Sequence, residues 1–293
     1  MKVEIDFQVH PFLGMNTIKD VIDAMYWAKL DVVALESLDS CLYPRVIKEA
    51  KEIYPNMDYD SVGIKLPNGR YLLNAREHNT KENFHILTIG YSSNRVNKDT
   101  EIRKVIDEGL ENNALIILDH PFVDNNYPRI YKNKEIKLKT AAHISEEKRI
   151  ELEVLCKEYS GNISLEWNGY CIPWMRKGLM LGLNMLGVGL RYSDVNKEAE
   201  KLSERLKSYN YNVPLVADTD LHARKKKHLD YMGAARIITD VEGETGKEIM
   251  KSIKKNIFER KYENVKRYVS ASHLLEAFCI PILFPKYFKK PRS

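Results

Sequence analysis

The stretch VEIDFQVH, residues 3–10, decides how the rest of the chain is interpreted. Its polar side chains Asp6, Gln8 and His10 alternate with apolar ones, so in an extended strand they share one face. A carboxylate and an imidazole on one face suit a metal site, whereas the amide of Gln8 is a poor ligand for a transition metal. The stretch therefore predicts a strand that carries a metal site, or the remains of one, with Gln8 as the weakened position.

The composition describes a globular chain with a small net charge. Its 293 residues, 44% of them apolar, suffice for one large α/β domain or two smaller ones. Charged residues form 30% of the chain, but the net charge is only +5, so the overall field does not require a polyanionic partner. Basic residues concentrate in ARKKKH, residues 223–228, and in PKYFKKPRS, residues 285–293, which are either solvated surfaces or phosphate-binding ones.

Cysteine spacing and hydropathy narrow the class of protein further. The four cysteines are widely separated and form no CxxC pair, so neither a zinc knuckle nor a disulfide framework is indicated, and we expect reduced, mostly buried thiols. No apolar run is long enough to span a bilayer, and the N-terminus leads directly into a charged strand. These features predict a cytoplasmic protein without a membrane partner.

Short β-rich runs alternate with amphipathic helical patterns along the chain, as in parallel strands joined by helices. Helices are predicted over residues 16–30, 43–54, 99–113, 145–161 and 195–212, with Asn16 or Thr17, Asp99 or Thr100, and Ser145 as N-caps. Strands are predicted over residues 3–10, 31–37, 84–91, 114–122, 162–170, 213–222 and 232–240, with two more on either side of the turn PNG, residues 67–69. No linker divides these units, so residues 1–293 predict one closed barrel, with residues 241–293 as a C-terminal helical extension and basic tail.

Unusual polar residues lie at or beside the C-terminal ends of these strands. In barrels of alternating strands and helices, residues at that rim carry the chemistry. The strand-end residues are His10, His120, Glu166, Asn168, Asp220 and His222.

Together with two carboxylate residues, four histidines form a candidate ligand set. It consists of His10, His85, His120, His222, Asp220 and Glu77. Imidazoles and carboxylates converging on one rim suit Zn²⁺, Mn²⁺ or Fe, and a carboxylate can bridge two ions. Asp220 and His222, two residues apart on a predicted strand, point the same way. The other four histidines, His78, His143, His228 and His273, are interpreted as structural.

The order of these motifs resembles the PHP family, the polymerase and histidinol phosphatase domain. The opening D-x-H-x-H strand of the family is similar to Asp6, Gln8 and His10, its AHP motif to LDHPF with His120, and its GSDAH motif to DTDLH with Asp220 and His222. Between them, a Glu shortly before a HILG-like strand is similar to Glu77 and His85, and an EvyN strand to LEWN, residues 165–168. The resemblance covers nearly the whole chain, from Asp6 to about Asp240, and implies a distorted (β/α)7 TIM-like barrel.

Two departures from the family pattern remove metal ligands from the implied site. Gln8 replaces the first His of the opening motif, and the family's TDH motif falls on a segment where Ser37 and Leu38 stand at its Asp and His positions. A Leu side chain cannot coordinate a metal. Glu36 and Asp39 are close enough in sequence to offer carboxylates, but the sequence does not show which of them points into the rim.

By the resemblance, the surviving residues would hold two divalent ions. Glu77 would bridge them, His85 and His120 would complete one site, and His10 with Asp220 the other, with Gln8 a weak oxygen donor at most. His222 would belong to a third ion whose other ligands are missing. Asp220, His222 and Glu77 would be catalytic, and the ligand-supporting residues would be Asp6, Glu166 and Asn168.

The implied activity is a metal-dependent phosphoesterase that hydrolyses a small phosphorylated metabolite or a nucleotide with a metal-bound hydroxide. Arg76, Arg191 and Arg224 are candidates to hold the phosphate. The alternative is a PHP-fold protein that has lost catalysis and binds a partner. That partner could be nucleic acid, contacted through Lys225 to Lys227 and the basic tail.

Overall fold

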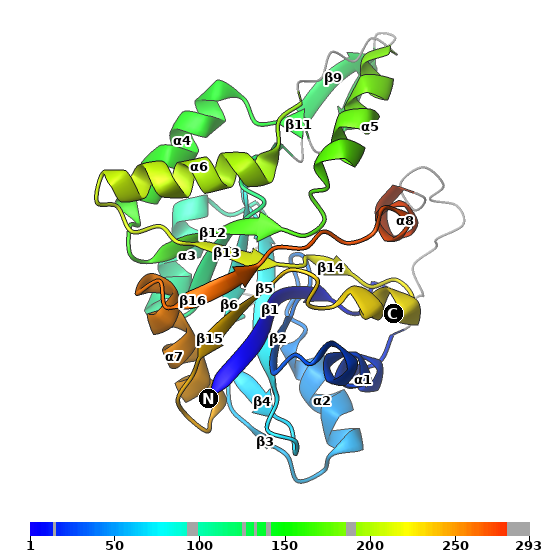
Figure 1. Ribbon diagram of the computed structural model, residues 1–293, viewed down its shortest axis with the longest axis vertical. Helices are drawn as coiled ribbons and strands as arrows, with labels where there is room; N and C mark the ends of the chain where they lie inside the picture. Colours follow the sequence, from blue (N-terminus) through cyan, green and yellow to red (C-terminus); the bar gives the residue numbers. More distant parts are fainter. Residues whose placement is uncertain are drawn as a thin grey trace.

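The computed structural model describes residues 1–13, 16–92, 99–124, 127–131, 134–138, 142–185 and 192–279. One mixed sheet of twelve strands forms the body, and its hydrogen-bonded path runs β13-β12-β7-β6-β5-β2-β1-β15-β16 (Figure 1). The strands on this path are β1 (Lys2–His10), β2 (Val32–Leu35), β5 (Tyr71–Asn79), β6 (His85–Ile89), β7 (Leu115–Asp119), β12 (Ile163–Asn168), β13 (Leu215–Asp218), β15 (Arg236–Asp240) and β16 (Tyr262–Val265). The short strands β3 (Asp58–Tyr59), β4 (Gly63–Lys65) and β14 (Leu221–His222) extend it, and the pairs β9 (Tyr127–Tyr131) with β10 (Lys134–Leu138) and β8 (Val123–Asp124) with β11 (Ala142–His143) stand apart.

The sheet curls until its two ends meet, which makes a nearly closed barrel. Strand β13, at one end of the path, contacts β1 and β15 at the other. Strand β14 pairs in parallel with β1, and the backbone N–H of Thr219 donates to Oδ1 of Asp6 at 3.0 Å. The predicted distorted barrel is therefore confirmed.

Strand β6 distorts the barrel because it runs antiparallel to both of its neighbours, β5 and β7. Its first residue, His85, is consequently opposite Asn79 at the end of β5 and Asp119 at the end of β7. A side chain at the start of this strand thus reaches the same rim as side chains at the ends of the others.

Alternate residues of the strands fill the barrel with apolar side chains below that rim. The interior cluster includes Val3, Ile5, Phe7, Val32, Ala34, Tyr71, Leu73, Ala75, Leu87, Ile89, Leu115, Ile117 and Val216. The helix α7 (Gly246–Phe258) contributes Ile249, Met250 and Ile253 to the same cluster. Part of the expected C-terminal extension is thus core, since β16 joins the sheet and α7 packs against the barrel interior.

A bulge in β1 changes which side chains of the opening strand face inward. The pairing of β1 with β2 shifts register between Asp6 and Val9. Phe7 belongs to the interior cluster, whereas Val9 packs outside against α1 (Ile18–Ala28). Because a bulge reverses the alternation, the simple pattern of one polar and one apolar face along the whole strand does not hold.

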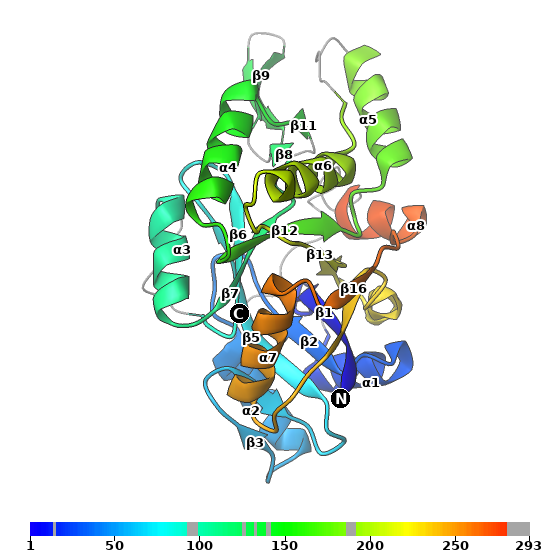
Figure 2. The same cartoon turned by 60° about the vertical axis from the view of Figure 1, so that its left-hand side comes forward.

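The other helices surround the sheet (Figures 1 and 2). They are α2 (Tyr43–Ile53), α3 (Ile102–Glu111), α4 (Glu146–Glu158), α5 (Pro173–Met185), α6 (Val195–Ser208), the 3-10 helix η1 (Lys226–Tyr231), α8 (Ala271–Leu274) and the π-helical turn η2 (Leu275–Cys279). Thr17 caps α1 and Ser145 caps α4, as predicted. The cap predicted for α3 is wrong: its N-cap is Glu101, because the backbone of Asp99 and Thr100 is hydrogen-bonded to Asn79 and Lys81.

No helix in the described ranges combines the length and the hydropathy needed to cross a bilayer. Among the described side chains, Cys41, Cys156 and Cys171 are free thiols.

Candidate metal centre

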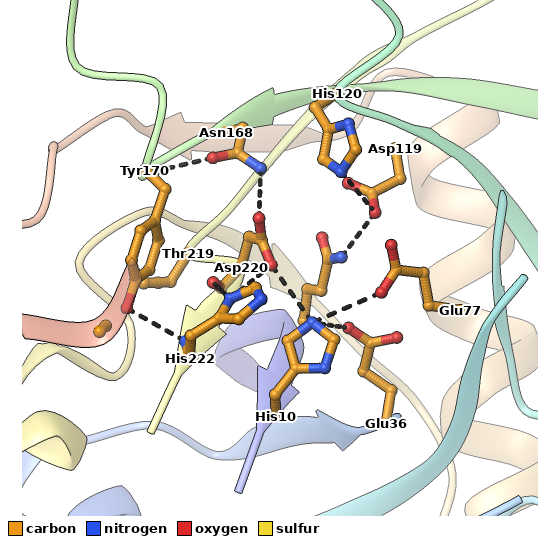
Figure 3. A network of polar contacts seen from close by, with 12 residues as sticks. His10, Glu36, Glu77, Asp119, His120, Asn168, Tyr170, Thr219, Asp220 and His222 are labelled. Carbon is orange, nitrogen blue, oxygen red and sulfur yellow. Dashed lines mark hydrogen bonds and ion pairs between the residues drawn. The ribbon is translucent and has the colours of Figure 1, made fainter. Parts of the chain in front are cut away.

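At the rim of the barrel, imidazoles and carboxylates from β1, β5, β6, β7, β14 and the loop after β2 converge (Figure 3). Three overlapping groups have ligand atoms that all lie within 4.8 Å of one another: Glu77, His85, Asp119 and His120; His10, Glu36 and Glu77; and His10, Asp220 and His222. Glu77 belongs to the first two groups and His10 to the last two. The cluster is thus one continuous arrangement in which a carboxylate and an imidazole each connect neighbouring groups.

The first group forms around the antiparallel strand β6. Nδ1 of His85 contacts Oε1 of Glu77, and Nε2 of His120 lies 3.3 Å from Oδ2 of Asp119. The imidazole rings of His85 and His120 are 4.8 Å apart between centroids. His120 takes a positive φ of 28° just after β7, which departs from the strand conformation and brings its ring beside Asp119 instead of opposite to it.

The second and third groups meet at His10. Its Nε2 lies 2.8 Å from Oε1 of Glu36, 3.3 Å from Oδ1 of Asp220 and 3.6 Å from Oε2 of Glu77. The ring of His222 is 4.3 Å from that of His10, because these two residues are register partners in the β1–β14 pair. His222 therefore lies with His10 and Asp220, and not apart from them.

The loop between β13 and β14 corrects one expectation about Asp220. Asp220 is not on a strand with His222, since β13 ends at Asp218 and Asp220 has a φ of 53°. Its carboxylate still reaches the cluster, with Oδ1 lying 3.2 Å from Nδ1 of His222. Left-handed backbone is tolerated better by Asp than by most residues, and here it turns the side chain inward.

Two predicted supporting residues, Glu166 and Asn168, lie behind the ligands on β12. The amide of Asn168 donates to Oε1 of Glu166 at 2.6 Å and to Oδ2 of Asp220 at 3.0 Å, and Oε2 of Glu166 accepts the backbone N–H of His120. Asn196 of α6 holds Asn168 in turn, accepting from its N–H at 3.0 Å and donating to its carbonyl at 2.9 Å. These contacts orient Asp220 and the turn that carries His120.

The opening strand supplies two further buried polar side chains. Asp6 accepts hydrogen bonds from the backbone N–H groups of Thr219 and Gly233, at 3.0 and 2.8 Å, so it fastens the Asp220 loop to β1. Gln8 donates its amide N–H to Oδ2 of Asp119 at 2.7 Å, and its Oε1 atom is buried without a hydrogen-bond donor in the described part of the chain. The amide nitrogen of Gln8 thus orients the carboxylate of Asp119, and its amide oxygen remains available as a ligand atom.

Crowded negative charge displaces the pKa values of the cluster carboxyls. Burial, together with the charges of Glu36 and Asp119, raises the pKa of Glu77 well above its ordinary value, and burial also raises the pKa of Glu36. Burial opposes ionisation of Asp220 as well, but the neighbouring His222 and His10 hold its pKa well below the ordinary range. Without cations, therefore, the carboxyl groups of Glu77 and Glu36 keep their protons to a higher pH than free carboxyl groups do.

The histidines respond to the same surroundings. Burial alone would lower the pKa of His10, but the charges of Glu36, Asp220 and Glu77 outweigh it and raise that pKa well above 6.5. Burial lowers the pKa values of His85 and His222. Nδ1 of His222 lies 2.8 Å from the carbonyl oxygen of Asp220, which can only accept, so this nitrogen carries the proton and Nε2 presents its lone pair.

The donor set fits divalent cations. Imidazole nitrogens and carboxylate oxygens are the ligands of Zn²⁺, Mn²⁺ and Fe in proteins. Several of these atoms are buried without a hydrogen bond from any described residue, among them Oε2 of Glu36, Oδ1 of Asp119 and Oε1 of Gln8. Buried oxygens of this kind cost free energy unless a cation or another donor meets them.

Sequence reasoning did not include three buried carboxylates of this rim among its site residues: Glu36, Asp119 and Asp218. Alternation along the strands would have indicated all three. Glu36 continues the inward series Val32 and Ala34, and Asp119 continues Leu115 and Ile117. Burial raises the pKa of Asp218, whose side chain is hydrogen-bonded to Glu166 on the neighbouring strand β12.

At the degenerate second motif, Ser37 and Leu38 contribute no ligand to the groups. Leu38 is 42% exposed and pairs through its backbone with Glu77, and Ser37 accepts a hydrogen bond from Ser40. Asp39 accepts the backbone N–H of Asn79 at 3.0 Å. Of the two carboxylates considered at this motif, Glu36 is therefore the one that joins the cluster.

Two of the three predicted phosphate-binding arginines, Arg76 and Arg224, are not brought to the cluster. Arg76 precedes the inward-facing Glu77, so its side chain leaves the opposite face of β5, and its Nη2 donates to the carbonyl of Asp39 at 3.2 Å. Nε of Arg224 donates to the carbonyl of Ala277 at 2.7 Å. Arg191 and the basic tail, residues 285–293, lie outside the described residues.

The lysines of the ARKKKH segment are engaged in ion pairs within the chain. Lys227 lies 2.7 Å and Lys225 3.6 Å from Oε2 of Glu276, and Lys226 lies 2.8 Å from Oδ1 of Asp20. Such pairing reduces the positive charge available to a polyanion. The nucleic-acid-binding alternative is accordingly not favoured.

Comparisons with known proteins identify the fold. No protein-family model and no curated protein matches the sequence. Among solved structures, a two-domain protein containing a predicted PHP-like metal-dependent phosphoesterase from Bacteroides vulgatus ATCC 8482 is similar over 95% of this chain and 69% of that chain, with 12% identity and a TM-score of 0.55. PsfC from Pseudomonas syringae PB-5123 is similar over 98% of this chain and 99% of that one, with 11% identity and a TM-score of 0.51.

A novel lesion-specific endonuclease from Pyrococcus furiosus is also similar, over 90% of this chain, with 16% identity and a TM-score of 0.51. This chain spans only 58% of that endonuclease. At such identities the likeness establishes the fold, and the PHP-type barrel predicted from the ordered motifs is confirmed.

Proposed function

We propose that this chain, which has a PHP-type fold, is a metal-dependent phosphoesterase whose cations are held by the rim cluster. The observation that carries the proposal is the convergence of buried imidazoles and carboxylates, several of whose oxygens meet no donor among the described residues. An apolar barrel interior does not retain so many ionisable groups at one end without a compensating cation.

The three ligand groups overlap, and together they define the proposed cation positions. Glu77, His85, Asp119 and His120 would hold one ion, and His10, Glu36 and Glu77 a second, with Glu77 shared between them. His10, Asp220 and His222 offer a third set of donors. We propose two resident ions. Asp220 and His222, which share His10 with the second position, would be further ligands of that ion and the residues nearest the reacting phosphate, and Gln8 would orient Asp119.

Divalent cations, when bound, supply Lewis-acid charge that offsets the negative charge of a phosphoryl group and lowers the pKa of water. The chain's own contribution is to orient and desolvate. Asn168 holds Asp220 with a 3.0 Å hydrogen bond, and the backbone carbonyl of Asp220 keeps His222 in the tautomer whose Nε2 can bind a cation or accept a proton.

A phosphate oxygen also needs a cationic partner, and we propose Arg176 in place of the three arginines predicted from the sequence. Arg176 is buried in the first turn of α5, and its Nη1 lies 3.5 Å from Sγ of Cys171. The pKa of the Cys171 thiol is raised to about 11. Burial is the main cause, the charge of Arg176 opposes it, and the charges of Asp220 and Asp119 add to it. Cys171 therefore interacts electrostatically with Arg176 on one side and with Asp220 and Asp119 of the cluster on the other, which supports a position of Arg176 near the cluster.

The substrate class that we propose is a phosphoester of a small metabolite or a nucleotide, and a nucleic-acid phosphodiester is also compatible with the same chemistry. One protein with a similar fold is a lesion-specific endonuclease, so a barrel of this type occurs in an enzyme that cleaves nucleic acid. A cytoplasmic location and a single-domain chain remain predictions.

The test combines metal analysis with a phosphoesterase assay. The full chain is stripped with a chelator, reloaded with Zn²⁺, Mn²⁺ or Fe²⁺, and assayed for metal content and for hydrolysis of p-nitrophenyl phosphate and bis(p-nitrophenyl) phosphate. We expect about two ions per chain and turnover that depends on them, with activity abolished in Asp220→Ala. A folded protein that binds no divalent metal under any of these conditions would contradict the proposal.

A further inference from the structure

Outside the cluster, two buried histidines that sequence reasoning left as structural, His228 and His273, lie in a second polar group. His273 belongs to α8, near the C-terminus, and His228 to η1, which follows the Asp220–His222 loop. Their rings are 4.6 Å apart between centroids, and the ring of Tyr231 is 4.5 Å from that of His273. The predicted barrel motifs assign no function to this group.

One hydroxyl connects this second group to the metal centre. The oxygen of Tyr170 accepts the backbone N–H of His222 at 3.1 Å, and the same hydroxyl contacts Nε2 of His273. Burial lowers the pKa of His273 to about 4, so its imidazole is neutral and Nε2 can accept. In the tautomer with the His273 proton on Nδ1, the His222 N–H donates to the Tyr170 oxygen and the Tyr170 O–H donates to Nε2 of His273.

Packing alone does not explain why a histidine occupies position 273. Nδ1 of His273 is buried and has no hydrogen-bond partner among the residues that the structure describes. An apolar ring of similar size would fill the same space without leaving a polar atom unmet. What the imidazole adds is an acceptor at the position of the Tyr170 hydroxyl.

The ARKKKH segment and η1, which directly follow the Asp220–His222 loop, hold residues 270–277 of the C-terminal segment. Arg224 donates to the carbonyl of Ala277 at 2.7 Å, Lys227 pairs with Glu276, and the Tyr231 hydroxyl lies 2.6 Å from Oγ of Ser270. The basic ARKKKH segment thus serves as an attachment for the C-terminal segment.

We propose that His273 and Tyr170 are positioning residues of the metal centre, through which the C-terminal segment fixes the backbone of His222 and hence the placement of its imidazole. This inference rests on the proposed function, since it takes His222 as a metal ligand. His222 is only two residues beyond the left-handed Asp220, so a fixed backbone N–H limits the rotation of the loop that carries both side chains. Groups that orient a ligand in this way commonly change metal affinity by about 10–100-fold when removed.

The test measures metal affinity by chelator competition in the full chain, with the unfolding temperature in EDTA as the fold control. His273→Gln keeps an acceptor near the position of Nε2, whereas His273→Leu and Tyr170→Phe each remove one side of the contact. We expect His273→Leu and Tyr170→Phe to bind Zn²⁺ or Mn²⁺ about 10-fold or more weakly than wild type, and His273→Gln to lie within a few-fold of it. Should His273→Leu fail to fold, Tyr170→Phe decides the question alone.

The matched control is His78→Leu. His78 is equally buried and hydrogen-bonded, with Nε2 3.1 Å from Oγ1 of Thr88, but it leaves the outer face of β5. The His78→Leu variant should have a lower unfolding temperature than wild type but the same metal affinity. Wild-type affinity in Tyr170→Phe, or equal losses in His273→Gln and His273→Leu, overturns this inference alone. A wild-type chain that binds no metal overturns the proposed function, and the inference with it.

Discussion

Nε2 of His10 lies 2.8 Å from Oε1 of Glu36, and both atoms are buried at the barrel rim. His10 ends the opening strand, and Glu36 directly follows β2, next to the Ser37 and Leu38 that occupy the degenerate second motif. The same nitrogen of His10 also lies 3.3 Å from Asp220, so this pair joins the Asp220 loop to the rest of the cluster. Glu36, which precedes the two substituted ligand positions Ser37 and Leu38, thus offers its carboxylate as a ligand to a cation held by His10 and Glu77.

Replacing Glu36 should remove one cation and leave the fold intact. Glu36→Gln keeps the size of the side chain and abolishes its charge, so we expect the metal content to fall from about two ions to about one, with kcat/KM reduced by about 100-fold. Elemental analysis of the dialysed protein, together with the phosphoesterase assay, measures both effects.

Asp39→Asn is the matched control for Glu36→Gln. Asp39 is three residues further along, its φ of 56° is one that Asn tolerates, and its carboxylate caps the backbone of Asn79 outside the ligand groups. Its metal content should remain that of the wild type. Two full equivalents of metal in Glu36→Gln would show that Glu36 is not a ligand.

Asn196 should matter to the metal centre although it touches none of the proposed ligands. Its side chain holds both backbone groups of Asn168, whose amide in turn orients Asp220. Asn196→Ala leaves these buried groups unpaired, so we expect a loss of about 1–3 kcal/mol in the free energy of unfolding and at least about a 10-fold loss in kcat. Denaturant titration and steady-state kinetics give the two numbers.

Ser203→Ala separates the two effects of Asn196→Ala. Ser203 is also buried on α6 and donates to the carbonyl of Val213 at 2.7 Å, but this bond is remote from the ligands. It should destabilise the protein without lowering kcat of the folded fraction. If Asn196→Ala behaves like Ser203→Ala, the hydrogen bonds of Asn196 are structural only.

Metal binding should become stronger as the pH rises from about 5 to 8. In the metal-free protein, Glu36, Glu77 and His10 all have raised pKa values, so the folded state holds protons that the unfolded chain releases. The stability that these three groups contribute therefore falls as the pH rises through this window, and cations must displace the same protons. Asp119 and Asp220, whose pKa values are lowered, remain ionised throughout.

The difference in unfolding temperature between the metal-loaded and EDTA-treated protein measures this linkage. It should be small at pH 5.5 and large at pH 7.5, and calorimetry in two buffers of different ionisation enthalpy should detect proton release on metal binding. A stabilisation by metal that is constant over this range would mean that the cluster carboxyls are already ionised without cations.

Arg176 should act on the substrate and not on the metal. Arg176→Lys keeps the charge but loses the planar fork that fits phosphate oxygens, so we expect KM to rise about 10-fold with metal content unchanged. Arg176→Ala should raise KM further. Unchanged KM values for both variants, in protein that retains its ions, would exclude Arg176 from the substrate site.

The sequence by itself determined the class of fold and pointed to many of the residues that the structure brings together at the rim; their roles as ligands remain a prediction. Alternating β-rich and helical segments predicted the barrel, and the ordered motifs brought together His10, Glu77, His85, His120, Asp220 and His222. The fold prediction succeeds because strand alternation and helical periodicity are local properties, readable from a few neighbouring residues. The same alternation, applied to residues 32–36 and 115–119, also contained the signal for Glu36 and Asp119.

Only the tertiary structure decided how these side chains are aimed. The bulge between Asp6 and Val9 reverses the faces of β1, and the left-handed turn at Asp220 directs a side chain that regular strand geometry would have placed otherwise. The reversed direction of β6 brings the first residue of that strand to the rim where its neighbours end. The C-terminal His273 meets Tyr170 from 103 residues away. Such contacts depend on long-range pairing and on single backbone angles, and a short stretch of sequence encodes neither by itself.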